Sequence, residues 1–126
     1  MDNPNYGEIA DRIEAGNARP FLDAPHIMAL LGYETKTDHG RLGVACRPAG
    51  ETHWQSMPNI YSADDFELWV LNKREGSLDD IRLEEDGRYA ISYSDNATGG
   101  NEYGVSMKLG RAMWAAFVRT VGGTDG

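Results

Sequence analysis

The sequence predicts an α+β fold in which helices pack on an antiparallel β-sheet, arranged as an α-β-α sandwich. Three segments support this prediction: a helix start with an aromatic amphipathic run at 62–73, a hairpin pattern at 81–93, and a helical apolar stripe at 105–121. With 126 residues, the chain is expected to form one domain, residues 1–126, with frayed ends at 1–3 and 122–126.

The segment 62–73 has the clearest helix start in the chain. Ser62 can accept a hydrogen bond from the backbone N–H of Asp65, which is the third helical residue. A serine and an acid at this spacing form the acidic variant of a capping box. The helix is expected to run to about Lys73 and to break at 75–77.

The hairpin pattern follows directly. Residues 81–84 and 89–93 each alternate apolar with polar or small side chains, and Gly87 in the turn between them can adopt a positive φ. One face of this hairpin is therefore apolar, and we expect helices to cover it.

Two shorter helices are predicted near the start of the chain. Asn3 and Pro4 resemble an N-cap followed by proline at the first helical position, which predicts a helix over 4–15. Asp23 is the expected cap of a second helix over 24–31.

The remaining segments are a strand, a loop and the terminal helix. Residues 41–47 alternate between two turn signals and predict a strand, with which 51–57 could pair. The polar, glycine-rich stretch 94–104 is the expected mobile loop, and 105–121 the final helix. The predicted core consists of Ile9, Ile13, Leu30, Val44, Phe66, Trp69, Val70, Leu83, Tyr89, Ile91, Leu109, Met113 and Phe117.

The net charge of −8 is concentrated in one segment. Residues 62–102 contain eleven acidic and four basic residues, whereas the rest of the chain is nearly balanced. Direct binding of nucleic acid usually requires a coherent basic face, so this distribution argues against it. It favours a solvated acidic surface that meets a basic protein.

Cysteine content and hydropathy bear on location. The single Cys46 cannot form an internal disulfide, which fits a reducing, cytoplasmic setting. The sequence has no apolar run near the roughly 20 residues of a membrane helix, and no secretion signal opens it.

The histidines and the cysteine suggest two kinds of site, a zinc site and a nucleophilic thiol. His39, Cys46 and His53 could bind zinc, but a fourth ligand and a closely spaced pair are missing. Cys46 could also act as the nucleophile of a small hydrolase with either histidine. Its position within an apolar alternation instead favours a buried structural thiol.

Other motifs have structural explanations. The paired carboxylates Asp79-Asp80 and 84–86 flank a turn, where water screens them, and they lack the ligand pattern of an EF-hand. Residues 98–101 could cradle an anion but match neither phosphate-binding fingerprint. Residues 23–33 resemble the first helix of a helix-turn-helix, yet no recognition helix follows.

Two segments resemble the phage α-β-α sandwich family. The block 58–64, followed by the aromatic helix with Trp69, is similar to that family's Tyr-Ser-x-Asp entry, and 108–118 is similar to its Ala-rich ending. The resemblance covers roughly 54–121 and implies a small phage or prophage protein without catalytic residues. The long polar connection 94–103 departs from the pattern and leaves the strand count open.

Together these observations predict a non-enzymatic binding protein of phage or prophage origin, acting in the host cytoplasm. No catalytic residue, cofactor or metal is expected. The alternatives are a small-molecule or nucleotide-binding module with 94–103 as a lid, and the cysteine hydrolase. A homodimer through an exposed sheet edge is a further option. The expected contact residues, for a host or phage protein with a basic surface, are Asp79, Asp80, Glu84, Glu85, Asp86 and Asp95.

Overall fold

A computed structural model describes residues 4–19, 21–38 and 43–123 and confirms the α+β prediction. Short α-helices, two of them continued by π-helical turns labelled η, combine with antiparallel strands. In chain order the elements are α1 (Tyr6–Ala15), α2 (Ala24–Leu30), β1 (Tyr33–Asp38), β2 (Gly43–Pro48), β3 (Gln55–Ser56), α3 (Ala63–Phe66), η1 (Glu67–Leu71), β4 (Gly76–Leu83), β5 (Tyr89–Asp95), β6 (Asn101–Ser106), α4 (Leu109–Phe117) and η2 (Val118–Gly122).

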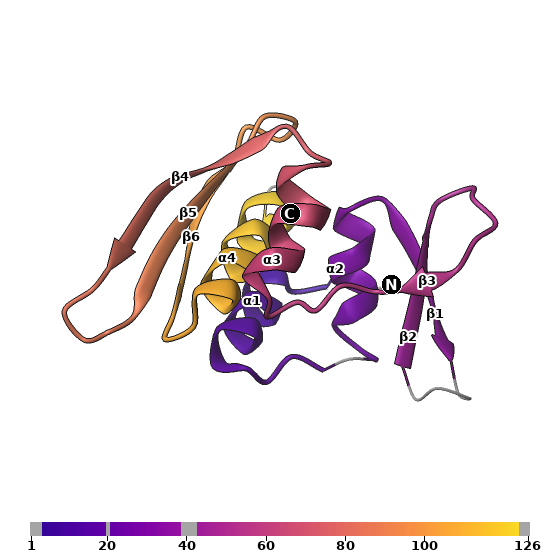
Figure 1. Ribbon diagram of the computed structural model, residues 1–126, viewed down its shortest axis with the longest axis horizontal. Coiled ribbons are helices and arrows are strands. Elements are labelled where there is room, and N and C mark those ends of the chain that lie inside the picture. Colours follow the sequence, from indigo (N-terminus) through magenta and orange to yellow (C-terminus); the bar gives the residue numbers. More distant parts are fainter. Residues whose placement is uncertain (1–3, 20, 39–42, 124–126) are drawn as a thin grey trace.

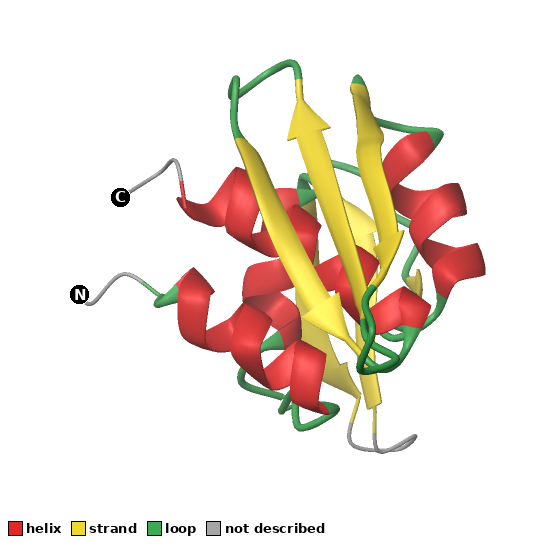
Figure 2. Cartoon of the chain, turned by 90° about the vertical axis from the view of Figure 1, so that its left-hand side faces the viewer, coloured by secondary structure: helices red, strands yellow, loops and turns green. Residues whose placement is uncertain are grey.

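The strands form two sheets, with the helices between them. One sheet has the order β1-β2-β3 and the other β4-β5-β6, and all pairings are antiparallel. Helix α4 packs on β5 and β6, while α2 packs on β1 (Figure 1). Figure 2 shows the β4-β5-β6 sheet in front with helices behind it, so helices cover only one face of this sheet within the described chain.

The starts of α1 and α2 differ from the prediction. Asn5, not Asn3, caps α1: its side chain accepts from the backbone N–H of Glu8 at 3.1 Å, and Asn3 lies outside the described residues. Asp23 precedes α2 as expected but makes no capping hydrogen bond, because its carboxylate binds Arg12 instead.

The capping prediction for the helix that follows Ser62 is confirmed. Ser62 Oγ accepts from the backbone N–H of Asp65 at 3.2 Å. The Asp65 carboxylate turns back further than a capping box requires and accepts from the N–H of Asn59 at 2.7 Å. The helix then continues through η1 and ends at Leu71, slightly before the predicted Lys73.

The hairpin prediction is also confirmed, but the loop predicted for 94–104 is wrong. Asp95 ends β5, and Asn101–Ser106 returns as the third strand β6, paired along β5. The final helix consequently starts at Leu109 rather than at 105. Strand β6 escaped prediction because its buried positions are Gly104 and Ser106, which give no apolar alternation.

The smaller sheet follows the prediction in part. The predicted strand 41–47 corresponds to β2, although its first two residues lie outside the described chain, and Gln55–Ser56 pairs with it as expected. Strand β1, which was not predicted, pairs with β2 along its whole length.

The core is an aromatic cluster between the helices and β5. Phe66 makes edge-to-face contacts with Tyr93, Trp114 and Phe117, at centroid distances of 6.0, 5.4 and 6.4 Å. The Trp114 indole N–H donates to the carbonyl of Ser62 at 2.9 Å, which ties α4 to the start of α3. Predicted core residues that are buried are Ile9, Ile13, Leu30, Phe66, Val70, Ile91, Met113 and Phe117.

The other predicted core residues lie nearer the surface. Val44, Trp69 and Tyr89 are half-buried, whereas Leu83 and Leu109 are exposed, which contradicts the prediction for both. Leu83 has the expected inward orientation, but the end of the hairpin projects beyond the helices (Figure 1). Leu109 is the first residue of α4 and therefore lacks a neighbouring turn to cover it.

Candidate functional site

The six carboxylates predicted to bind a partner fall into two groups. Asp79 and Asp80 lie on β4, and Glu84, Glu85 and Asp86 lie in the turn at the end of the hairpin. Asp95 is placed elsewhere, at the inner end of β5, where it is only 2% exposed. The structure therefore brings five of the six onto the surface of one hairpin.

The outward carboxylates of β4 are bonded to neighbouring side chains. Asp79 accepts from the hydroxyls of Ser77 and Ser94 and from the amide of Asn101, and the Ser94 and Ser77 bonds lower its pKa. Asp80 accepts from the Tyr103 hydroxyl at 2.9 Å and pairs with a neighbouring arginine. Both carboxylates are negatively charged, and hydrogen bonds within the protein already fix their orientation.

The turn carries less constrained charge. Asp86 accepts from the backbone N–H of Arg88 at 3.1 Å and from its Nε at 2.6 Å. These bonds, the backbone bond above all, lower the pKa of Asp86. Among the residues that the structure describes, Glu84 and Glu85 have no side-chain hydrogen bond or ion pair. A shallow depression of about 580 Å³ lies beside these residues and Val105.

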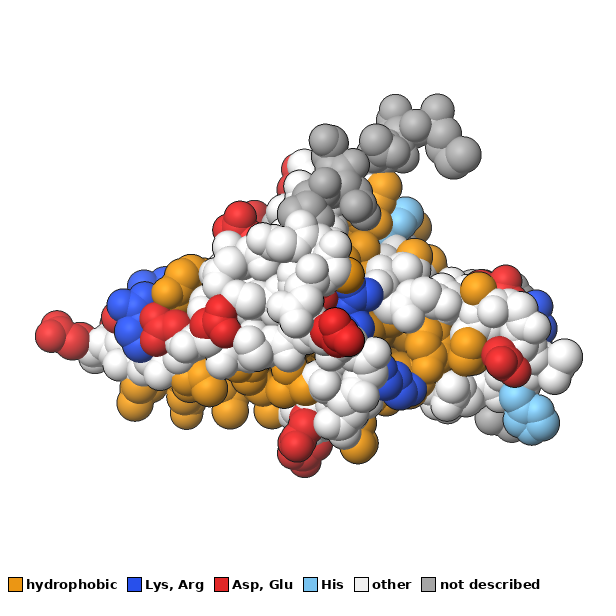
Figure 3. All heavy atoms as spheres, turned by 90° about the horizontal axis from the view of Figure 1, so that it is seen from above, with side chains coloured by type: hydrophobic (Ala, Val, Ile, Leu, Met, Phe, Trp, Pro, Cys, Tyr) orange, Lys and Arg blue, Asp and Glu red, His pale blue; other side chains and the backbone are white. Residues whose placement is uncertain are grey.

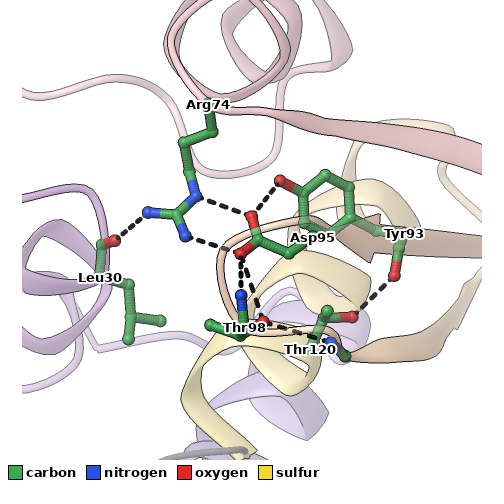
Figure 4. Close-up of polar contacts among 7 residues, drawn as sticks. Leu30, Arg74, Tyr93, Asp95, Thr98 and Thr120 are labelled. Carbon is green, nitrogen blue, oxygen red and sulfur yellow. Dashed lines mark hydrogen bonds and ion pairs between the residues drawn. The ribbon is translucent and has the colours of Figure 1, made fainter.

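Asp95 is the acceptor at the centre of a buried network (Figure 4). Arg74 donates to both of its carboxylate oxygens at 2.9 Å, and the Tyr93 hydroxyl donates to Oδ1 at 2.9 Å. Thr98 donates from its backbone at 3.1 Å, and Arg74 also reaches the carbonyl of Leu30 at 3.0 Å. Burial disfavours the charge of Asp95, but the bonds from Arg74 and Tyr93 outweigh it and hold its pKa below the ordinary value.

This network is structural rather than a contact surface. It joins the end of α2, the chain after η1 and the end of β5, and burial together with Asp95 raises the pKa of Tyr93. An oxygen that already accepts two or more bonds inside the protein is not available to a surface partner.

The cysteine and histidines do not form a metal site within the described chain. Cys46 is buried in β2, where burial raises the pKa of its thiol, and His53 is exposed in the connection before β3. His39 lies outside the described residues. No group of three potential ligands occurs among those described.

The glycine-rich segment 98–101 is a tight turn that uses its own donors. Thr98 and Gly99 donate backbone N–H groups to Asp95, and Gly100 donates to the Thr98 hydroxyl. These N–H groups are not free to hold an anion, and Asn101 already belongs to β6. After α2 the chain enters β1, so the helix-turn-helix interpretation has no recognition helix here.

One cluster escaped sequence analysis. On the outer face of the smaller sheet, Lys36 Nζ and Arg47 Cζ lie 4.6 and 4.3 Å from the ring centroid of Trp54. A depression of about 360 Å³ adjoins it. If β1 had been recognised as a strand, Lys36 would have been placed beside β2, on the same face as Arg47, and the cationic cluster could have been predicted.

A scan of family models, a search of curated proteins and a search of solved structures each found no match to this chain. The described part of the chain contains no helix that is both long and apolar enough to cross a membrane.

Proposed function

We propose that this chain is a non-enzymatic binding protein that acts by protein–protein contact through the acidic surface of its β4–β5 hairpin. The contact residues in this proposal are Asp79, Asp80, Glu84, Glu85 and Asp86, without the buried Asp95. The observation that supports it is the grouping of these carboxylates on a hairpin that projects beyond the helices (Figure 1).

The proposed partner is a host or phage protein with a basic surface. Opposite charges on two surfaces accelerate their encounter and discriminate against wrong partners. The same field repels phosphate groups, so the proposal excludes nucleic acid and anionic membrane surfaces as direct partners. Phage or prophage origin and action in the host cytoplasm are part of the proposal and rest on the sequence resemblance and on the single cysteine.

The test is partner capture from a bacterial lysate with three versions of the chain. One is the native protein, and one replaces the five hairpin acids by their amides. A matched control changes net charge equally by replacing five exposed acids elsewhere that form no ion pair within the described chain: Glu8, Glu51, Glu67, Glu75 and Glu102.

The native protein and the matched control should retain a basic partner that elutes as salt rises, because screening weakens the contact. The hairpin variant should lose it. Recovery of an acidic partner, retention that ignores salt, or equal loss with both variants would refute the proposal.

A further inference from the structure

The β4–β5 hairpin also carries an apolar surface that the helices leave uncovered. Ile81 and Leu83 point toward the helix side of the sheet, yet they are 58% and 68% exposed. Met107, which follows β6, is 59% exposed. In Figure 3 hydrophobic side chains form a row along the lower edge of the left half, where β4–β6 lie in Figure 1.

These side chains belong to one continuous strip. Leu83 pairs directly with Tyr89, whose ring is half-buried against the core, and Tyr89 pairs with the residue before Met107. The Met107 methyl group reaches the hairpin turn, 3.5 Å from the position that a Gly87 Cβ would take. We call Ile81, Leu83, Tyr89 and Met107 the apolar strip.

A strip of large exposed apolar side chains on a water-facing surface commonly marks an interaction site. Its occupant can be inferred from the charges around it. The strip ends at the hairpin turn, where Glu84 and Glu85 lack partners within the described chain and Asp86 is shared with Arg88. Arg82, which lies between Ile81 and Leu83 along β4, pairs with Asp80, and Lys108 follows Met107 in the sequence. Residues 79–88 together with Lys108 carry five acidic and three basic side chains, so the surroundings are net negative.

A second copy of the chain fits this surface poorly. Each copy has a net charge of −8 and would bring the same carboxylates together. Strand β4, the open edge of the sheet, is also interrupted by a bulge between Leu78 and Asp80 that carries Asp79, and such bulges block edge-to-edge pairing.

We infer that the apolar strip and the unpaired glutamates of the turn form one docking site for an amphipathic cationic segment of a partner protein. Apolar side chains of the segment cover Ile81, Leu83 and Met107, and its lysines or arginines meet Glu84 and Glu85. This inference rests on the proposed function and narrows it: of the five hairpin acids it assigns the main charged contact to those of the turn, and it adds the apolar strip beside them.

The experiment measures fluorescence anisotropy with two labelled peptides of identical Leu and Lys composition. One peptide has the leucines on a single helical face, and the other is scrambled so that no such face exists. Three double variants are compared with the native chain: Ile81→Ser with Leu83→Ser, Glu84→Gln with Glu85→Gln, and Asp79→Asn with Asp80→Asn. The last two change net charge equally.

The native chain should bind the amphipathic peptide at least about tenfold more tightly than the scrambled one. The Ile81/Leu83 variant should lose that preference while keeping its salt dependence. The Glu84/Glu85 variant should weaken binding and flatten the salt dependence, and the Asp79/Asp80 variant should change little.

Unchanged binding by the Ile81/Leu83 variant would overturn the inference. If both acidic variants then weaken binding, the proposed acidic surface survives without the strip, and if no variant matters, both proposals fail. A native dimer in light scattering that dissociates in the Ile81/Leu83 variant would assign the strip to a second copy and also overturn the inference. Thermal melting checks that each variant folds. A further measurement needs no variant: NMR amide shifts of the native chain on peptide addition are expected at residues 81–89 and 106–109.

Discussion

Among the described residues two aspartates are buried, and each is bound by an arginine. Asp23 accepts from Arg12 at 2.8 and 2.7 Å, and Asp95 accepts from Arg74 at 2.9 Å on both oxygens. Burial disfavours both charges, but the arginine hydrogen bonds outweigh it and lower both pKa values. Each pair joins segments that are distant along the chain, so losing one partner leaves a charge uncompensated at a junction of several elements.

Replacing Asp95 by asparagine should reveal this cost. Arg74 would keep its charge without its counter-ion, and its side chain is 21% exposed, so some of the loss is recovered by water. We expect the free energy of unfolding to fall by about 2–4 kcal/mol. Urea unfolding measures it, with Glu85→Gln as the exposed control, which removes one negative charge but no side-chain bond within the described chain and should therefore change little. Equal stability of the two variants would show that the network contributes nothing.

Cys46 allows a direct test of the hydrolase alternative. Its thiol is buried and its pKa is raised by burial, so little thiolate is present near neutral pH. We expect a thiol reagent such as DTNB to react with the native protein only slowly and with the urea-unfolded protein within seconds. Fast reaction of the folded chain at pH 7 would favour a nucleophilic role for Cys46 over a structural one.

At the level of elements, the close approach of β6 to α4 decides the packing of the second sheet. Gly104 faces the helix, and a Cβ built there would lie 2.0 Å from the carbonyl oxygen of Ala112 and 2.6 Å from the nitrogen of Ala116. Backbone atoms of a helix cannot move aside as a flexible side chain can. Glycine at this position therefore sets the distance between sheet and helix.

Gly104→Ala should consequently separate β6 from α4 and reduce the free energy of unfolding by about 3 kcal/mol. The matched control is Gly123→Ala, because Gly123 has φ −67° and no atom within 4 Å of the added Cβ. Thermal unfolding of both variants provides the comparison. A Gly104→Ala protein as stable as the control would mean that the sheet adjusts its distance freely.

The hairpin shows how an element can be predicted correctly while its environment is not. Residues 81–84 and 89–93 have the alternation of two half-buried strands, and the pairing is observed. Alternation gives the direction in which Leu83 points but says nothing of whether a helix reaches it. The helices end before the turn, which leaves an apolar face that sequence analysis assigned to the core.

For the whole molecule, the lowered pKa values of Asp23 and Asp95 predict how stability depends on pH. A carboxyl group with a lower pKa in the folded than in the unfolded state stabilises the fold when ionised. With an unfolded value near 3.9, this contribution should be complete above about pH 5 and should decline as the pH falls through the folded values. Protonating the many surface acids relieves repulsion and acts in the opposite direction.

The melting temperature from about pH 3 to pH 7 separates these effects when Asp95→Asn is compared with the native chain. The difference between the two should be largest above about pH 5 and should shrink at lower pH, because protonated Asp95 no longer compensates Arg74. A difference that stays constant across this range would show that the ionised carboxylate is not the source of the stability.

Much of the fold could be predicted from local signals. Ser62 and Asp65 predict the helix start, Gly16 ends α1 with φ 77°, and Gly87 closes the hairpin with φ 89°. Strands β1 and β6 could not be predicted, because their side chains are mostly polar and their order depends on hydrogen bonds to β2 and β5. The candidate site divides in the same way: five carboxylates were placed on the surface from charge alone, whereas Asp95 and the apolar strip depend on which neighbours come close.

The sequence by itself determined the capped helix that follows Ser62, the hairpin, the α+β class and the acidic character of residues 62–102, because a cap, a turn and side-chain alternation act over a few residues. Only the tertiary structure decided that the strands form two sheets with the helices between them, that Arg74 binds the buried Asp95, and that no helix covers Ile81 and Leu83. Those features depend on the lengths and packing distances of elements far apart in the chain, and such distances are fixed only when the whole core assembles.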